Sequence, residues 1–378
     1  MTNLVMKSRT TILVTFGPTA SRSPPFATKL TAKHLVLALC LYLCRTLGAD
    51  TDDAQEIPLH AQMLTGAPLV EYLQKNQKLF QVRSTPTPGF KYKLMDVAFA
   101  NANQNLNPVV NDDNDTGADL PENYDPRIVW KNCSSFHTIR DQANCGSCWA
   151  VSTAAAISDR ICVATKGKKQ VYISATDILT CCGAPCGMGC QGGWPIRAWE
   201  YFEYDGVVSG GPYLGKGCCS PYPLHPCGRH GNDTFYGNCR GMAPTPPCKK
   251  RCQPGFRGMY RIDKRYGEPG RAYRLPKSEV KIRREIKERG SVTATFAVYE
   301  DFSHYQSGIY KHTAGYITGF HAVKMIGWGK ENGTDYWLIA NSWHDDWGEN
   351  GFFRMIRGIN DCGIEETVAA GIVDVESL

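Results

Sequence analysis

Three short stretches of the sequence carry side chains that together could perform nucleophilic chemistry. QANCGSCWA contains Cys148, GFHAVKMIGWG contains His321, and LIANSWHDDWG contains Asn341. A cysteine nucleophile needs a base beside it and a further group that orients this base. On its own, Cys148 with Cys145 three residues earlier is open to three interpretations: a disulfide half beside a nucleophile, two metal ligands, or two packed thiols.

The position of Cys148 favours the nucleophile. It stands where a Gly-containing loop meets the Ala-rich stretch WAVSTAAAISDRIC, which predicts a helix. The unpaired N–H groups and partial positive charge of a helix N-terminus lower the pKa of a thiol placed there. Gln142 could donate its amide to a developing oxyanion, and Trp343 could cover a hydrogen bond between Asn341 and His321.

The second half of the chain predicts mainly strands, which must carry His321 and Asn341. Apolar runs predict strands at 291–299, 321–329, 335–343 and 351–358, and an amphipathic helix at 277–290. The first half predicts the helix after Cys148, followed by loops rich in Gly, Pro and Cys. We therefore expect an α+β fold with a helical half beside a twisted antiparallel β half.

The three stretches resemble the signature blocks of papain-like cysteine proteases, in the same order. LPENYDPRIVW, CCGAPCGMGCQGGWP and VSGGPYLGKGCCSPYPLHPC resemble the cathepsin B branch of that family, so the likeness covers about 120–370. It implies a papain-like two-domain fold, with a helical left domain, an antiparallel β-barrel-like right domain and the active-site cleft between them.

The resemblance also implies the roles of individual residues. Cys148 is the expected nucleophile, His321 the acid and base, Asn341 its orienting partner and Gln142 the oxyanion donor. A thiolate–imidazolium pair would attack a peptide carbonyl and form an acyl-enzyme that water hydrolyses. The QGG turn at Gly192–Gly193 resembles the one that binds extended substrate backbone.

The occluding loop of the cathepsin B branch resembles residues 227–239, CGRHGNDTFYGNC. Two adjacent histidines there bind a substrate's C-terminal carboxylate and allow removal of C-terminal dipeptides. Here the second is His230 and the first is replaced by Arg229. Arginine stays charged where histidine titrates, so we expect Arg229 to pair with Asp141. A second latch to Asp346 is expected to be lost.

Two further departures concern the substrate side chain. The acidic residue that lets cathepsin B accept Arg at its second subsite is matched by Thr367, with Glu366 one residue away, which predicts a preference for apolar residues. Phe320 replaces a glycine and is expected to crowd the leaving side. YWLIANSWHDDWGE also resembles a pattern of cathepsin B-like proteases of blood-feeding worms that is linked to haemoglobin digestion, although most of these residues simply form the strand before Asn341.

Seventeen cysteines, most of them between 133 and 252, indicate an oxidising compartment and a disulfide framework. Their irregular spacing argues against zinc, and no metal or cofactor is expected. The resemblance implies the pairs Cys133–Cys162, Cys145–Cys190, Cys181–Cys248, Cys182–Cys186, Cys218–Cys252 and Cys227–Cys239. Cys148, Cys219 and Cys362 remain, and Cys219 could compete with Cys218 for Cys252.

The organisation of the chain suggests a proenzyme. Residues 1–49 are expected to be an N-terminal extension and signal peptide, because a short apolar run follows basic residues. The cysteine-free residues 50–119 predict a helix and an Asn/Asp-rich linker, and are interpreted as an inhibitory propeptide; the alternative is an ordinary N-terminal subdomain. Residues 120–378 are the expected mature protease domain.

The remaining expectations concern partners and location. The net charge of +6 is spread along the chain, and its short basic runs lack interleaved aromatic residues, so no nucleic-acid partner is expected. We expect a monomer without a membrane span, secreted or lysosomal, with four glycosylation sequons. Its partners would be peptide substrates, its own propeptide and cystatin-type inhibitors. A catalytically silent binding protein on the same fold is the competing hypothesis.

Overall fold

The computed structural model of the chain describes residues 56–99 and 115–378. The expected N-terminal extension and signal peptide (1–49) lie outside the described residues, and so does much of the Asn/Asp-rich linker. Within the two described ranges, no helix is both long enough and apolar enough to cross a bilayer.

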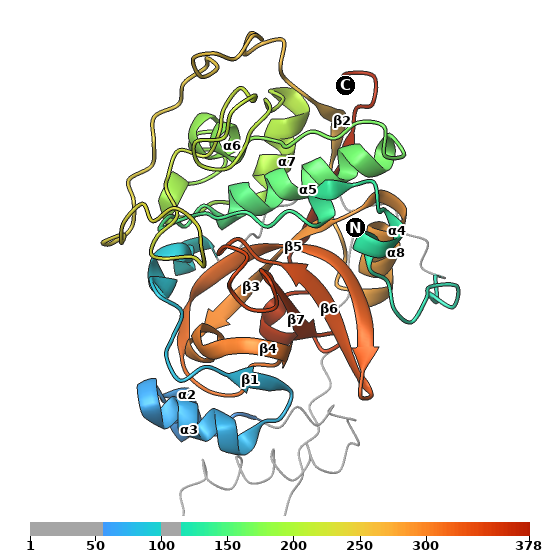
Figure 1. The fold of residues 1–378 in the computed structure, drawn as a ribbon. Coiled ribbons are helices and arrows are strands. Elements are labelled where there is room, and N and C mark those ends of the chain that lie inside the picture. Colours follow the sequence, from blue (N-terminus) through green and yellow to red (C-terminus); the bar gives the residue numbers. More distant parts are fainter. Residues whose placement is uncertain (1–55, 100–114) are drawn as a thin grey trace, which may run out of the picture. The chain divides into compact units, whose positions relative to one another are not determined.

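Helices dominate the first half of the expected protease domain (Figure 1). α5 (Cys148–Ala164) is the predicted Ala-rich helix, and it is buried along nearly its whole length, because small side chains let neighbouring elements approach from several sides. The hydroxyl of Ser174 caps α6 (Ala175–Cys181), and α7 (Pro195–Tyr204) begins with a proline, which suits the first helical position. The short α4 (Pro126–Val129) precedes them.

The second half contributes to an eight-stranded sheet among the described residues. In spatial order its strands are β1 (Phe80–Val82), β4 (Tyr305–Tyr310), β7 (Phe352–Ile356), β6 (Thr334–Ala340), β5 (Ile317–Glu331), β3 (Val292–Tyr299), β8 (Val368–Val373) and β2 (Gly267–Arg274). The four predicted strands are β3, β5, β6 and β7, and the predicted helix is α8 (Glu279–Arg289). The α+β class is confirmed.

One strand pair departs from the expected antiparallel arrangement. β4 and β7 run parallel, whereas the other pairs of the sheet are antiparallel. β4 precedes β5 in the chain, but β7 and β6 lie between them in the sheet, so no hairpin sets the direction of β4. The sheet is therefore mixed at this one place.

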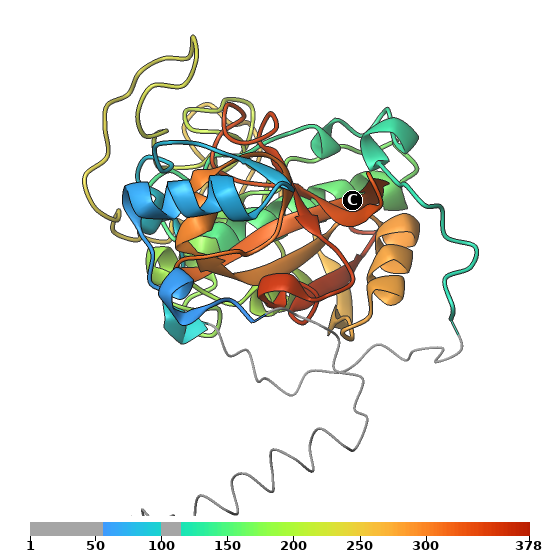
Figure 2. The same ribbon diagram turned by 90° about the horizontal axis from the view of Figure 1, so that it is seen from below.

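Residues 57–99, which we call the lead segment, pack against the strand half (Figures 1 and 2). α2 (Leu59–Gln62) and α3 (Gly66–Asn76) are followed by β1, which extends the sheet beside β4. The predicted apolar face of α3 is buried through Leu69, Val70 and Leu73. Gly308 permits the close contact with β1, since a Cβ there would lie 2.5 Å from the carbonyl oxygen of Leu79.

Five of the six expected disulfides are present: Cys133–Cys162, Cys145–Cys190, Cys181–Cys248, Cys182–Cys186 and Cys227–Cys239. The sixth expectation, Cys218–Cys252, is wrong, because Cys252 pairs with Cys219. Cys219 points into a small buried cluster that Cys252 also contacts, whereas the neighbouring Cys218 points toward the Gly215 carbonyl. Cys148, Cys218 and Cys362 are free thiols.

Candidate active site

Cys148 is the first residue of α5, at the junction between the helical half and the sheet. Its side chain is completely buried. The backbone N–H of Ala322, the residue after His321, donates to its Sγ atom at 3.3 Å. The helix N-terminus and β5 thus bring the thiol and the imidazole to one place, as the sequence predicted.

His321 lies inside β5, which begins four residues earlier, at Ile317, rather than at the histidine itself. Its Nε2 is 2.7 Å from Oδ1 of Asn341, which follows β6. A carbonyl oxygen can only accept, so Nε2 carries the proton and donates. The neutral ring therefore presents an unprotonated Nδ1, which is buried and has no hydrogen-bond partner. This nitrogen is available as a base.

Trp343 covers this hydrogen bond. Its ring centroid is 4.7 Å from that of His321, and it is almost fully buried. Phe302 packs edge-on against the Trp343 ring at 5.7 Å, and Phe90 of the lead segment does so at 5.9 Å. These aromatic side chains keep water from the pair of His321 and Asn341.

The amide of Gln142 is held in one orientation. Its Oε1 accepts the Ser342 hydroxyl at 2.7 Å, so its Nε2 points toward the site. That nitrogen donates to the Cys145 carbonyl at 2.7 Å and to the Lys93 carbonyl of the lead segment at 2.8 Å. The Lys93 carbonyl of the lead segment therefore accepts the hydrogen bond that Gln142 is expected to donate to an oxyanion.

Burial determines the protonation of the pair. It raises the pKa of the Cys148 thiol to about 12, although backbone N–H groups act in the opposite direction. Burial also lowers the pKa of His321 to about 4, against the raising effect of its hydrogen bond to Asn341. Both groups are neutral between these values, so the covered site disfavours the thiolate–imidazolium pair that the resemblance implies.

Residues 94–96 of the lead segment cross the site in an extended form, between two short 3-10 helices, Phe90–Lys93 and Val97–Phe99. Met95 and Phe320 pair through two backbone hydrogen bonds of 2.8 and 3.1 Å, and the Asp96 N–H donates to the Gln191 carbonyl at 3.0 Å. At Phe320, where crowding was expected, the backbone instead pairs with Met95 of the lead segment like a neighbouring strand. Peptide backbone fits across this site.

Gly192 and Gly193 lie beside the lead segment and show why glycine is needed. A Cβ on Gly192, whose φ is +139°, would lie 2.4 Å from the ring of Phe99. A Cβ on Gly193 would meet the Cys186 carbonyl and the ring of Trp149. Only glycine permits this approach of a peptide.

Phe99 occupies the pocket beside Thr367. Its ring packs edge-on against Trp194 at 5.1 Å, and only about 20 Å³ of the pocket stays empty. The Thr367 hydroxyl donates to the Thr295 carbonyl at 2.6 Å, and Arg274 also lines the pocket. The preference of this pocket for apolar substrate residues stays a prediction.

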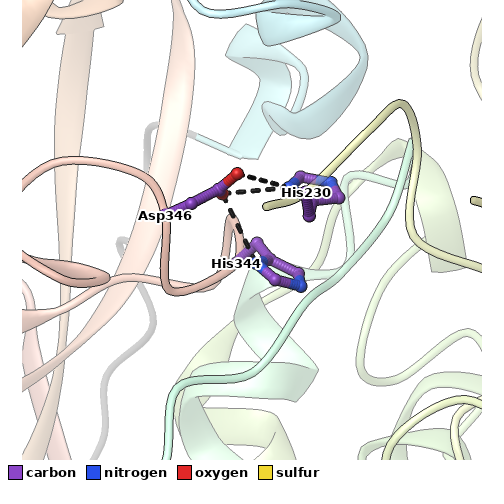
Figure 3. A group of neighbouring side chains, drawn as sticks. All are labelled: His230, His344 and Asp346. Carbon is purple, nitrogen blue, oxygen red and sulfur yellow. Dashed lines mark hydrogen bonds and ion pairs between the residues drawn. The ribbon is translucent and has the colours of Figure 1, made fainter. Parts of the chain in front are cut away.

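The loop 227–239 reaches the turn after β6 through His230 (Figure 3). Its Nδ1 is 2.9 Å from Oδ1 of Asp346, and its Nε2 is 3.9 Å from Asp141. The expected pair of Arg229 and Asp141 does not form among the described residues; Arg229 stacks over Phe235 at 5.3 Å. Consecutive residues of the loop point to opposite sides, and His230 takes the inward position.

The latch expected to be lost was one from a loop arginine to Asp346; the loop nevertheless contacts Asp346, through His230. A disulfide between Cys227 and Cys239 closes the base of the loop. A cavity of about 420 Å³ lies beneath it, lined by Asp141, Tyr222 and His230 among others.

Sequence reasoning missed two residues. Lys93 of the lead segment is buried, its Nζ donates to the Ala143 carbonyl at 3.1 Å, and no pattern in the sequence marks it. His344 stacks on His230 with ring centroids 3.9 Å apart. The run HDD at 344–346, inside one of the signature blocks, could have drawn attention to His344.

Sequence comparisons connect the chain with known proteins. The profile of the papain family cysteine proteases matches residues 120–372. "Cathepsin B-like cysteine proteinase 1" of Haemonchus contortus is 67% identical over 346 residues, 92% of this chain and 100% of the relative. A "gut-specific cysteine proteinase" of Caenorhabditis elegans is 46% identical over 90% of this chain and 98% of its own.

A solved structure shares the fold as well. "ProCathepsin B S9 from Trypanosoma congolense" is 34% identical, with a TM-score of 0.69, over 82% of this chain and 99% of the other. That protein is a proenzyme, and the likeness covers most of the described residues. The chain belongs to the papain family of cysteine proteases and is a peptidase of the cathepsin B-like kind.

Proposed function

We propose that the peptidase cleaves peptide bonds through Cys148 and His321. Nδ1 of His321 takes the thiol proton, and the thiolate attacks the carbonyl carbon. The Gln142 amide and the Cys148 N–H stabilise the oxyanion, and His321 then protonates the leaving amine. Water hydrolyses the resulting thioester with His321 as base. The hydrogen bond of 2.7 Å from Nε2 to Asn341 supports this assignment, because it leaves Nδ1 as the base.

The lead segment is the proposed inhibitory propeptide. One observation carries this proposal: a backbone carbonyl of the lead segment, that of Lys93, accepts the Gln142 amide at 2.8 Å, where a substrate oxyanion would sit. Met95 and Phe99 occupy further substrate positions. Removal of this segment would admit water and substrate together, and the ion pair could then form.

His230 is the proposed receptor for the C-terminal carboxylate of a substrate, which would add dipeptidyl carboxypeptidase activity. It lines the cavity of about 420 Å³ and is held at the loop by Asp346. Arg229 is exposed and engaged with Phe235, so it is not required for this contact.

Digestion of dietary protein, including haemoglobin, is the proposed physiological role, in a secreted or lysosomal setting. The gut-specific relative of Caenorhabditis elegans supports it, as does the stretch YWLIANSWHDDWGE.

Product mapping tests these proposals together. Processed enzyme is incubated with an unbiased peptide mixture at mildly acidic pH, with Cys148→Ala as control. Internal cuts together with released C-terminal dipeptides are expected. Internal cuts alone would overturn the carboxypeptidase proposal, and products equal to those of the control would overturn the roles given to Cys148 and His321.

A further inference from the structure

We propose that His230, His344 and Asp346 form a binding site for one divalent transition-metal ion of the zinc class. The ion would tie the loop 227–239 to the turn that follows β6. Nothing in the peptidase mechanism uses His344 or requires a metal, so this inference does not rest on the proposed function.

The three side chains converge on one point (Figure 3). Nδ1 of His230 and Nδ1 of His344 lie 2.9 and 3.4 Å from Oδ1 of Asp346. One ligand atom from each residue can be chosen so that all three lie within 4.8 Å of one another. Zinc–nitrogen and zinc–oxygen bonds of about 2.0–2.2 Å place neighbouring ligands roughly 3–4 Å apart, which matches these separations.

The outer nitrogen of each ring has a hydrogen-bond partner of the kind found beside metal-binding histidines. Nε2 of His230 is 3.1 Å from the Cys227 carbonyl, and Nε2 of His344 is 3.1 Å from Oδ2 of Asp233. Histidine ligands usually donate their second N–H to a carbonyl or a carboxylate, which fixes the tautomer. Here both contacts favour the tautomer that carries its proton on Nε2, so Nδ1 of each ring has the free lone pair.

A further carboxylate lies beside His344. Nδ1 of His344 is shielded from solvent, and the carboxylates of Asp345 and Asp346 lie 2.8 and 3.4 Å from it. Asp345 can therefore supply a fourth oxygen. Two imidazoles with one or two carboxylates are a ligand set that zinc accepts.

Metal binding would require a small rearrangement of the rings. They are stacked at 15° with centroids 3.9 Å apart, and an imidazole lone pair lies in its ring plane. Rotation of both rings about χ2 would direct the two lone pairs at one ion. The bound ion would join residues 114 positions apart in the chain, His230 and His344, and so hold the loop over the cavity beneath it.

The test is calorimetric titration of Zn²⁺ into the full-length Cys148→Ala chain at neutral pH. This background prevents self-processing and removes the thiol that could chelate metal with His321. One ion per chain is expected. His344→Gln and Asp346→Asn should each weaken binding by at least about tenfold, since each removes one of few ligands. His137→Asn, at an exposed histidine elsewhere, should leave affinity unchanged.

A spectroscopic measurement locates the ion. Co²⁺ added to the same chain should give the intense visible bands of a four-coordinate site, and these should disappear in His344→Gln. Thermal unfolding without metal shows that each variant is folded. Absence of saturable Zn²⁺ binding, or binding and Co²⁺ bands that survive both substitutions, would overturn the proposal.

Discussion

The site around Cys148 and the loop 227–239 are held together by different forces. At Cys148 the important groups are buried, neutral and fixed by short hydrogen bonds such as that between His321 and Asn341. At the loop, the imidazole of His230 lies 2.9 Å from the carboxylate of a half-exposed Asp346, and a disulfide closes the base. Buried neutral contacts preserve one geometry, whereas surface ion pairs are individually weak. The proposed chemistry belongs to the first region, and the proposed recognition of a substrate's C-terminus belongs to the second.

This contrast predicts that the largest loss of activity comes from the buried region. Cys148→Ala should lower kcat/KM for a peptide substrate by at least about 10⁴-fold, because no other group can form the thioester. The measurement is steady-state hydrolysis by processed enzyme. Cys362→Ala, at another free thiol, should retain activity; equal losses in both variants would contradict the assignment.

The Cys148 thiol should be less reactive while the lead segment covers the site and more reactive after the segment is removed. With the pKa of Cys148 raised to about 12 and that of His321 lowered to about 4, the thiolate fraction of the full-length chain rises about tenfold per pH unit across neutral pH. Processed enzyme should react at least about 100-fold faster at pH ~6 and show a flat profile there, because an imidazolium can then hold the thiolate.

Alkylation by iodoacetamide, followed by intact-mass spectrometry from pH 5 to 9, measures both profiles. The Cys148→Ala chain corrects for labelling at Cys218 and Cys362. Identical pH profiles before and after processing would show that the lead segment does not control the protonation of the pair.

The pocket beside Thr367 should determine how firmly the lead segment covers the site. Phe99→Ala removes a buried ring and should weaken the covered state by about 2 kcal/mol, or roughly 30-fold in the rate of Cys148 alkylation in the intact chain. Val97→Ala lies in the same short helix but is exposed, and should change the rate little. Equal effects would mean that Phe99 is not an anchor.

Substitutions in the loop 227–239 should have the smallest effect, and this effect should be confined to the release of C-terminal dipeptides. His230→Ala is expected to lower the release of C-terminal dipeptides about tenfold, because the substrate carboxylate loses its partner, while internal cleavage stays within about twofold. Arg229→Ala should change neither, since Arg229 stacks on Phe235. Product mapping with peptides that have a free or an amidated C-terminus measures both activities; an equal loss of both would remove the distinction between the two regions.

Regular elements with a strong local pattern were predictable. The helix that begins at Cys148 follows from its run of alanines, and β3, β5, β6 and β7 follow from apolar runs. β1, β2, β4 and β8 were not predicted. β2, for example, contains Gly, Pro and charged residues and pairs only with β8, so the contact rather than the sequence makes it a strand.

The candidate site was predictable where residue types are rare and their roles narrow. Cys148, His321, Asn341 and Gln142 were chosen from the sequence. In the structure His321 pairs with Asn341, the N–H of the residue after His321 donates to Cys148, and Gln142 donates to the Lys93 carbonyl of the lead segment. The contacts of the lead segment were not predictable, because they join residues of ordinary type, such as Met95 and Phe320, across more than two hundred positions.

Local periodicity in the sequence by itself determined the class of fold. The resemblance of its motifs to those of papain-like proteases implied the candidate reacting side chains and most of the disulfide pairs. The tertiary structure alone decided between neighbours that the sequence cannot distinguish. Cys219 rather than Cys218 pairs with Cys252, and His230 rather than Arg229 faces Asp141 and Asp346. Adjacent residues share one stretch of sequence but point in opposite directions, and only the packing around them sets which one faces inward.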